Sequence, residues 1–176
     1  IICRSFMHSR IVLVGFPGSG KSTIGKKLAK QLDYRFVDLD QEIEKRVQLS
    51  IPAIFEQFGE NQFRIWEQTQ LQETLQLEKV VIATGGGTPC FYQNMELITQ
   101  HSEAVYIQMS TKSLFDRLLH SKKTRPLIRG LSDQELMQFV ENELLKREQF
   151  YLQAHHVVKG ENIKIEPLIK ILEEND

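Results

Sequence analysis

Short apolar runs alternate with longer amphipathic stretches along most of the chain. Runs rich in Val, Ile and Leu predict buried strands, whereas stretches with an apolar residue at every third or fourth position predict helices. The first pattern predicts five strands: Ile11–Val14, Tyr34–Leu39, Val80–Thr84, Ala104–Met109 and His155–Val158. Strands that alternate with helices form parallel sheets covered on both faces. We therefore expect one α/β domain.

Capping residues mark where several of the predicted helices begin. Ser50 and Ser110 can each cap a helix, and Ser132 with Glu135 has the spacing of a capping box. The predicted helices are Lys21–Leu32, Gln41–Val47, one after Ser50, Glu60–Leu77, one after Ser110, one after Ser132 and a last one with Pro167 in its first turn. Residues 120–131 are rich in Lys and Arg and lack apolar periodicity, which predicts a mobile loop.

Composition narrows the class of protein. The chain has 176 residues, a formal net charge of −1 and 41% hydrophobic residues. This length suits a single domain over residues 1–176, with residues 1–10 as an N-terminal extension and start, and Met7 as an alternative start. The balanced charge argues against a nucleic-acid partner, and no apolar run is long enough to predict a membrane span. Cys3 and Cys90 lack the spacing of a zinc site or disulfide framework, which favours a cytoplasmic protein.

The stretch GFPGSGKST, residues 15–23, lies between the first predicted strand and the first predicted helix. It matches the phosphate-loop pattern of a glycine, four further residues and Gly-Lys-Ser. Glycines let backbone N–H groups turn inward around phosphates, and the helix that follows directs its free N–H groups at the same anion. We expect the lysine to reach the terminal phosphates and the serine hydroxyl to bind Mg²⁺. The residues predicted to bind a nucleoside triphosphate are Gly18, Ser19, Gly20, Lys21, Ser22 and Thr23.

Two carboxylates follow the second predicted strand. In Asp38-Leu39-Asp40, the two-residue period of a strand places both side chains on one side, near the strand end and beside the glycine loop. Next to a magnesium triphosphate, one carboxylate can orient metal-bound water or take a proton. The other can accept hydrogen bonds from a hydroxylated substrate. The alternative for Asp40 is a capping role for the helix predicted to begin at Gln41.

Other glycines and arginines suit an anionic ligand. Gly85-Gly86-Gly87 ends the third predicted strand, where three glycines indicate close approach of a ligand to the main chain. Arg64 has a planar fork suited to a carboxylate, but Arg64 and Arg147 taken singly also fit solvated helix surfaces. Arg125 suits either a charged surface loop or a lid that brings a cation to the γ-phosphate. His155 and His156 lack partners at metal-ligand spacing and are interpreted as structural.

In this order, these elements resemble the shikimate kinase family. The matching motifs are Gly15–Thr23, Asp38-x-Asp40, Gly59-Glu60-x-x-Phe63-Arg64, Gly85-Gly86-Gly87, Arg125-Pro126-Leu127 and Arg147-x-x-x-Tyr151. They span most of the chain, and the Phe-Arg, triple-glycine and Arg-Pro-Leu motifs together are far more specific than the phosphate loop. The resemblance implies a three-layer P-loop kinase fold with a central five-stranded parallel sheet and a mobile lid at residues 120–131.

The resemblance further implies ATP-dependent phosphorylation of the 3-hydroxyl of shikimate, in aromatic amino-acid biosynthesis, with Mg²⁺ as cofactor. It implies catalytic roles for Lys21, Asp38 and Arg125, and Mg²⁺ contacts from Ser22 and Asp38. Arg117 and Arg125 would join the phosphate loop in binding ATP. The residues implied to bind shikimate are Asp40, Arg64, Gly85, Gly86, Gly87 and Arg147. Whether Asp38 or Asp40 accepts the hydroxyl proton is left open.

The chain departs from the family at Gln149, where the family motif Arg-x-Pro-x-Tyr has proline. Two other functions are compatible with the phosphate loop. One is a small-molecule kinase of the same fold acting on another acceptor, such as gluconate. The other is a nucleotide-dependent binding module without catalysis. A monomer is the default expectation, with ATP and shikimate as ligands.

Overall fold

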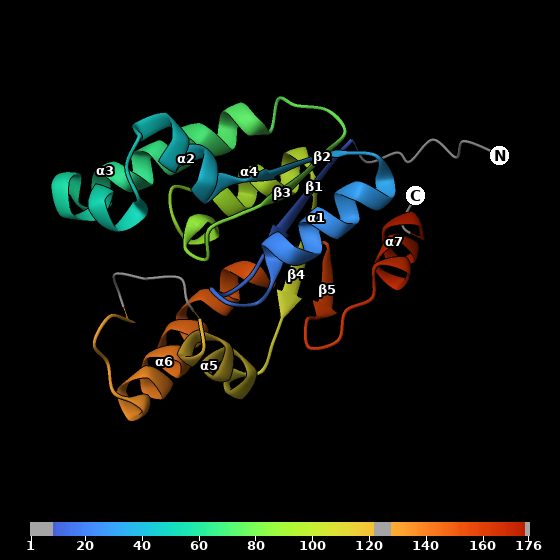
Figure 1. Cartoon of the computed structure of the whole chain (residues 1–176). Coiled ribbons are helices and arrows are strands. Elements are labelled where there is room, and N and C mark those ends of the chain that lie inside the picture. The colour runs from blue at the N-terminus through green and yellow to red at the C-terminus, as the bar shows by residue number, and fades with distance from the viewer. Residues whose placement is uncertain (1–8, 122–127, 175–176) are drawn as a thin grey trace.

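The computed structural model describes residues 9–121 and 128–174 (Figure 1). Half of the predicted lid, residues 122–127 with Arg125, lies outside the described residues, as does the start of the predicted N-terminal extension. Within the described ranges, no helix is long and apolar enough to cross a membrane.

A five-stranded sheet forms the centre of the molecule, with strand order β2-β3-β1-β4-β5. All neighbouring strands pair in parallel. The strands are β1 (Arg10–Val14), β2 (Arg35–Asp38), β3 (Val80–Ala83), β4 (Glu103–Gln108) and β5 (His156–Lys159). The five predicted strands are confirmed, each to within one residue at either end. The central strand β1 is buried because helices cover the sheet on both faces.

Helices pack on the two faces of the sheet and complete a three-layer fold (Figure 1). Helices α1 (Lys21–Leu32) and α7 (Ile165–Glu173) cover one face, where Ile11 and Leu13 of β1 lie among their apolar side chains. Helices α3 (Ile51–Thr74), α4 (Asn94–His101), α5 (Thr111–Leu119) and α6 (Asp133–Tyr151) contribute to the core on the other face. Helix α2 (Leu39–Val47) packs on α3.

The predicted caps are present where the helices begin. Ser50 and Ser110 accept hydrogen bonds from main-chain N–H groups of α3 and α5 at 3.4 and 3.2 Å. At α6, Ser132 Oγ accepts from the Glu135 N–H, and the Glu135 carboxylate accepts from the Ser132 N–H at 2.8 Å. These bonds satisfy helix N–H groups that have no partner within the helix. Helix α4 was not among the predicted elements.

Two boundaries differ from the prediction. The helix after Ser50 and the predicted Glu60–Leu77 helix run together as α3, which ends at Thr74 and is interrupted only at Gly59, where φ is 78° and ψ 168°. Helix α2 starts at Leu39 rather than Gln41, so the two-residue period of a strand does not extend to Asp40. Asp38 is the capping residue, and its carboxylate accepts the Gln41 N–H at 3.4 Å. The capping alternative for Asp40 is therefore wrong.

Candidate active site

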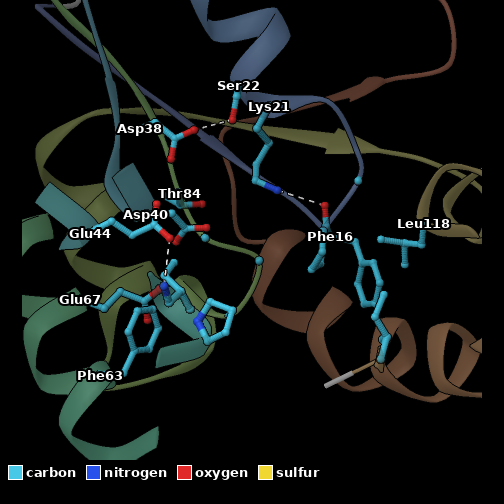
Figure 2. Close-up of a pocket in the computed structure, with 18 of the residues that line it drawn as sticks. Phe16, Lys21, Ser22, Asp38, Asp40, Glu44, Phe63, Glu67, Thr84 and Leu118 are labelled. Carbon is cyan, nitrogen blue, oxygen red and sulfur yellow. Dashed lines mark hydrogen bonds between the residues drawn. The ribbon is translucent and has the colours of Figure 1, made fainter. Parts of the chain in front are cut away.

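A cavity of about 740 Å³ lies at the carboxyl ends of β1, β2 and β3 (Figure 2). Its wall is built by the phosphate loop, the start of α2, both halves of α3, the triple-glycine loop and α6. Because the three strands are neighbours in the sheet, the loops that follow them meet at one edge. The predicted site residues that line the cavity are Gly18, Gly20, Lys21, Ser22, Thr23, Asp38, Asp40, Arg64, Gly85, Gly86, Gly87 and Arg147.

The phosphate loop connects β1 to α1. Gly20, the residue before α1, has φ of 93°, a backbone conformation in which any residue with a side chain would be strained. The Lys21 ammonium group is buried and donates to the carbonyls of Gly15 and Phe16 at 2.8 and 3.0 Å. Ser19 is fully buried within the loop, and its N–H donates to the Phe16 carbonyl at 3.1 Å. The N-terminus of α1 therefore faces the cavity with a cation beside it.

Ser22 and Asp38 meet across the start of α1 and the end of β2. The Ser22 hydroxyl donates to Asp38 Oδ2 at 2.6 Å, as Figure 2 shows. Two oxygen ligands side by side, next to a phosphate-binding loop, match the chemistry of Mg²⁺, which takes its other ligands from phosphates and water. Among the described residues, no group of three or more His, Cys, Asp or Glu could hold a metal ion by itself. The pair fits Mg²⁺ that arrives with a nucleotide.

Further acidic side chains line the cavity below Asp38 in the view of Figure 2. Glu67 on α3 is 1% exposed, accepts from the Thr88 hydroxyl at 2.6 Å and binds Arg64 Nη1 at 2.8 Å. Burial raises the pKa of the Glu67 carboxyl, although Arg64 acts in the opposite direction. Asp40 and Glu44 of α2 line the same wall. Here the cavity offers hydrogen-bond acceptors suited to hydroxyl groups.

Arg64 is buried, so the alternative interpretation of it as a solvated residue on a helix surface is wrong. Its side chain is 7% exposed and is bound by Glu67 and by Glu60, the latter at 2.9 Å. Burial acts to lower the pKa of Arg64, but its interactions with the two carboxylates outweigh burial and raise it. The guanidinium group therefore stays charged at the cavity wall.

Arg147 reaches the cavity from α6. Its side chain is 13% exposed, pairs with Glu143 at 2.8 Å and lies 5.5 Å from the centre of the Phe16 ring. Arg64 and Arg147 come from helices far apart in the sequence and line one cavity. Arg117, on α5, lies on the phosphate loop, where its Nη1 donates to the Gly18 carbonyl at 3.3 Å. Arg125 is outside the described residues.

Packing against neighbouring protein groups is one reason why glycine occupies the three positions after β3, in addition to any contact with a ligand. A Cβ atom at Gly85 would come within 2.8 Å of the Glu67 carboxylate, and one at Gly87 within 2.8 Å of the Arg64 guanidinium. A Cβ atom at Gly86 would overlap with Pro17 of the phosphate loop. The glycines let the main chain pass between charged side chains and the phosphate loop while still lining the cavity.

Sequence reasoning missed the carboxylate partners of the arginines. Glu60 and Glu67 lie four residues before and three residues after Arg64, and Glu143 lies four residues before Arg147, which are neighbouring positions on a helix. That spacing was a usable signal for pairing. It carries no information about burial, which separates Glu67 from the more exposed Glu60 and Glu143.

Known proteins resemble this chain in both sequence and structure. The family profile described as "Shikimate kinase" matches residues 17–174. The shikimate kinase of Phocaeicola vulgatus is 40% identical over 156 residues, 89% of each chain. The structure of shikimate kinase from Acinetobacter baumannii in complex with shikimate aligns with a TM-score of 0.88 at 31% identity, covering 97% of this chain and 96% of that one.

A gluconokinase from Sinorhizobium meliloti aligns with a TM-score of 0.60 at 16% identity, covering 95% of this chain and 93% of that one. That likeness shows the shared kinase fold alone. The predicted three-layer P-loop kinase fold is confirmed by the parallel sheet, its order and these neighbours. The family profile matches most of the chain, and a relative 40% identical to it matches over 89% of both sequences. The protein therefore belongs to the shikimate kinase family.

Proposed function

We propose that the protein transfers the γ-phosphoryl group of ATP to the 3-hydroxyl group of shikimate. The products are ADP and shikimate 3-phosphate. One observation carries the proposal: a phosphate loop and two guanidinium groups, those of Arg64 and Arg147, line the same cavity. A phosphorylated donor and a carboxylated acceptor thereby have binding groups within one space. The family relationship supports the choice of shikimate.

The nucleotide side of the cavity is formed by residues 15–23. Lys21 is held beside the loop carbonyls and is positioned to turn its ammonium group to the terminal phosphates. Ser22 and Asp38 would hold Mg²⁺, which neutralises charge on the transferring phosphoryl group when bound. Arg117 is held against the loop at the Gly18 carbonyl, and we include it among the residues that would contact the nucleotide. From the sequence we add Arg125 as a further cation for the transition state.

The acceptor side is formed by α2, α3, α6 and the triple-glycine loop. Arg64 and Arg147 would bind the carboxylate, since a guanidinium fork matches its two oxygens. Asp40 would accept the proton of the attacking hydroxyl group. Asp38 suits that role less, because Ser22 binds one of its oxygens and the Gln41 N–H the other. The reaction then depends on positioning and charge neutralisation, without a covalent enzyme intermediate.

Three further predictions from the sequence belong to this proposal. The whole chain would act as one domain with residues 120–131 as its lid. The protein would act as a monomer, and it would act in the cytoplasm.

Release of ADP in the presence of different acceptors tests the proposal. Purified protein is given ATP with shikimate, gluconate or no acceptor, each with and without Mg²⁺. We expect ADP release only when shikimate and Mg²⁺ are both present. The variant Lys21→Ala, assayed in the same way, should release no ADP. Gluconate-dependent ADP would assign the chain to another small-molecule kinase activity. ATP binding without ADP release in any arm would identify a binding module.

A further inference from the structure

We propose that Phe91 is a positioning residue for Arg64 and, through it, for the carboxylate of the acceptor. The inference rests on the proposed function and deepens its acceptor site. Phe91 follows the short 3₁₀ helix Thr88–Cys90 that leads out of the triple-glycine loop. The cavity lining includes Arg64 but not Phe91, so the ring acts on the arginine and not on the ligand directly.

The ring of Phe91 covers one face of the Arg64 guanidinium group. The distance from Arg64 Cζ to the centre of the Phe91 ring is 4.2 Å, against 5.2 Å to the ring of Phe63. Both distances are within the range of cation–π attraction, and the shorter one belongs to Phe91. The carboxylates of Glu60 and Glu67 bind the N–H groups along the edge of the same guanidinium. Carboxylates thus hold its edge and an aromatic ring holds its face.

Burial values show what the ring protects. Phe91 is 36% exposed, whereas the Arg64 side chain beneath it is 7% exposed. Replacing the ring with a smaller side chain would open the guanidinium face to water. Water screens the attraction between a guanidinium and a carboxylate, and an unsupported guanidinium plane can tilt away from the two oxygens that it binds. Acceptor affinity would then fall without any change at the phosphate loop.

The loop that carries Phe91 is tied to the helix that carries Arg64. Gln68, one turn after Arg64 on α3, donates to the Tyr92 carbonyl at 3.2 Å. Tyr92 and Gln93 both have positive φ, 48° and 60°, which non-glycine residues adopt at a cost. Such a conformation persists only where surrounding contacts hold it. The position of the Phe91 ring over Arg64 is therefore fixed from both sides of the contact.

The test replaces the ring and measures acceptor and nucleotide separately. For Phe91→Leu, we expect KM and the calorimetric Kd for shikimate to rise about three- to tenfold, in line with a partly desolvated cation–π contact. The KM for ATP and kcat should stay within about twofold. Phe91→Tyr keeps the aromatic face and should restore native values. Tyr92→Leu, in the same loop and 48% exposed, is the matched control.

A double-mutant cycle identifies Arg64 as the intermediary. Phe91→Leu should have little additional effect in an Arg64→Lys background, and little effect on weak turnover of shikimate methyl ester, which lacks the carboxylate. Unchanged shikimate affinity in a folded Phe91→Leu protein would overturn the inference, as would a full additional loss in the Arg64→Lys background. Failure of the proposed function is a separate result, namely no shikimate-dependent ADP and no shikimate binding by the native chain.

Discussion

The two arginines proposed to bind the acceptor, Arg64 and Arg147, differ in the carboxylates that they neutralise. Arg64 is the charge partner of Glu67, a carboxylate that is 1% exposed. Arg147 pairs with Glu143, which is 22% exposed and also contacts Lys146. Removing Arg64 would leave a buried carboxylate without its cation, whereas Glu143 would remain partly hydrated and paired. Arg147 is therefore the better position at which to test acceptor binding alone.

Replacing each arginine by alanine should separate binding from stability. We expect Arg147→Ala to raise KM for shikimate about ten- to hundredfold, because charge-assisted hydrogen bonds contribute about 1.5–3 kcal/mol. KM for ATP and the free energy of unfolding should change little. Arg64→Ala should additionally lower the free energy of unfolding by about 3–5 kcal/mol. Steady-state kinetics measure KM for each substrate, and urea titrations measure the free energy of unfolding. Equal losses of shikimate and ATP binding in Arg147→Ala would contradict the assigned role.

At the scale of elements, the interruption in α3 shapes the cavity wall that we propose faces the acceptor. Gly59 separates the half of α3 that carries Phe55 from the half that carries Phe63, and the two rings lie 4.9 Å apart. Both rings line the cavity. A φ of 78° with ψ of 168° is a conformation found almost only in glycine. The bend that brings the two halves to one wall therefore depends on the absence of a side chain at this position.

Gly59→Ala should lower the free energy of unfolding by about 1–3 kcal/mol, the usual cost of forcing such a backbone conformation on another residue. The cost is conformational and not steric, since a Cβ atom there would have no neighbour within 4 Å among the described residues. Chemical denaturation measures it, with Glu56→Ala in the preceding exposed helix segment as control. Full retention of stability would mean that the backbone relaxes freely at this point.

Local signals predicted the strands and every α-helix except α4, but not the contacts between elements. Apolar runs and serine caps depend on residues close in sequence, and they placed the strands to within one residue. The predicted strand ends at Leu39, and its two-residue period does not hold for Asp40, because a helix that starts directly after a buried strand leaves no break in the apolar pattern. The packing reason for Gly85–Gly87 involves Pro17, Arg64 and Glu67, which lie on other elements. No spacing rule contains such contacts between distant segments.

At the scale of the molecule, strand order brings the two halves of the reaction together. The loop after β1 lines the proposed nucleotide side of the cavity, and the loop after β3, its neighbour in the sheet, lines part of the proposed acceptor side. Helices α3 and α6 then supply arginines from two directions. Since each ligand has contacts of its own, each should stabilise the folded chain independently.

Thermal unfolding with single ligands tests this separation. Shikimate alone and Mg²⁺–ADP alone should each raise Tm, with about 2.7 kcal/mol of stabilisation at a hundred times the Kd. In Arg147→Ala, the stabilisation by shikimate at the same concentration should fall to about 0.4–1.4 kcal/mol, and the shift with Mg²⁺–ADP should be retained. Loss of both shifts in a variant that still folds would show that the two sides do not bind independently.

The contact between Pro17 and Gly86 has a consequence for redesign. Because the ring of Pro17 fills the space that a Gly86 side chain would need, the phosphate loop packs directly on the main chain of the triple-glycine loop. New side chains on α3 or α6 can change which carboxylic acid binds as the acceptor. They cannot increase the distance between the phosphate loop and the acceptor hydroxyl group. An acceptor with its hydroxyl much further from its carboxylate would require inserted residues after β3 and not substitutions.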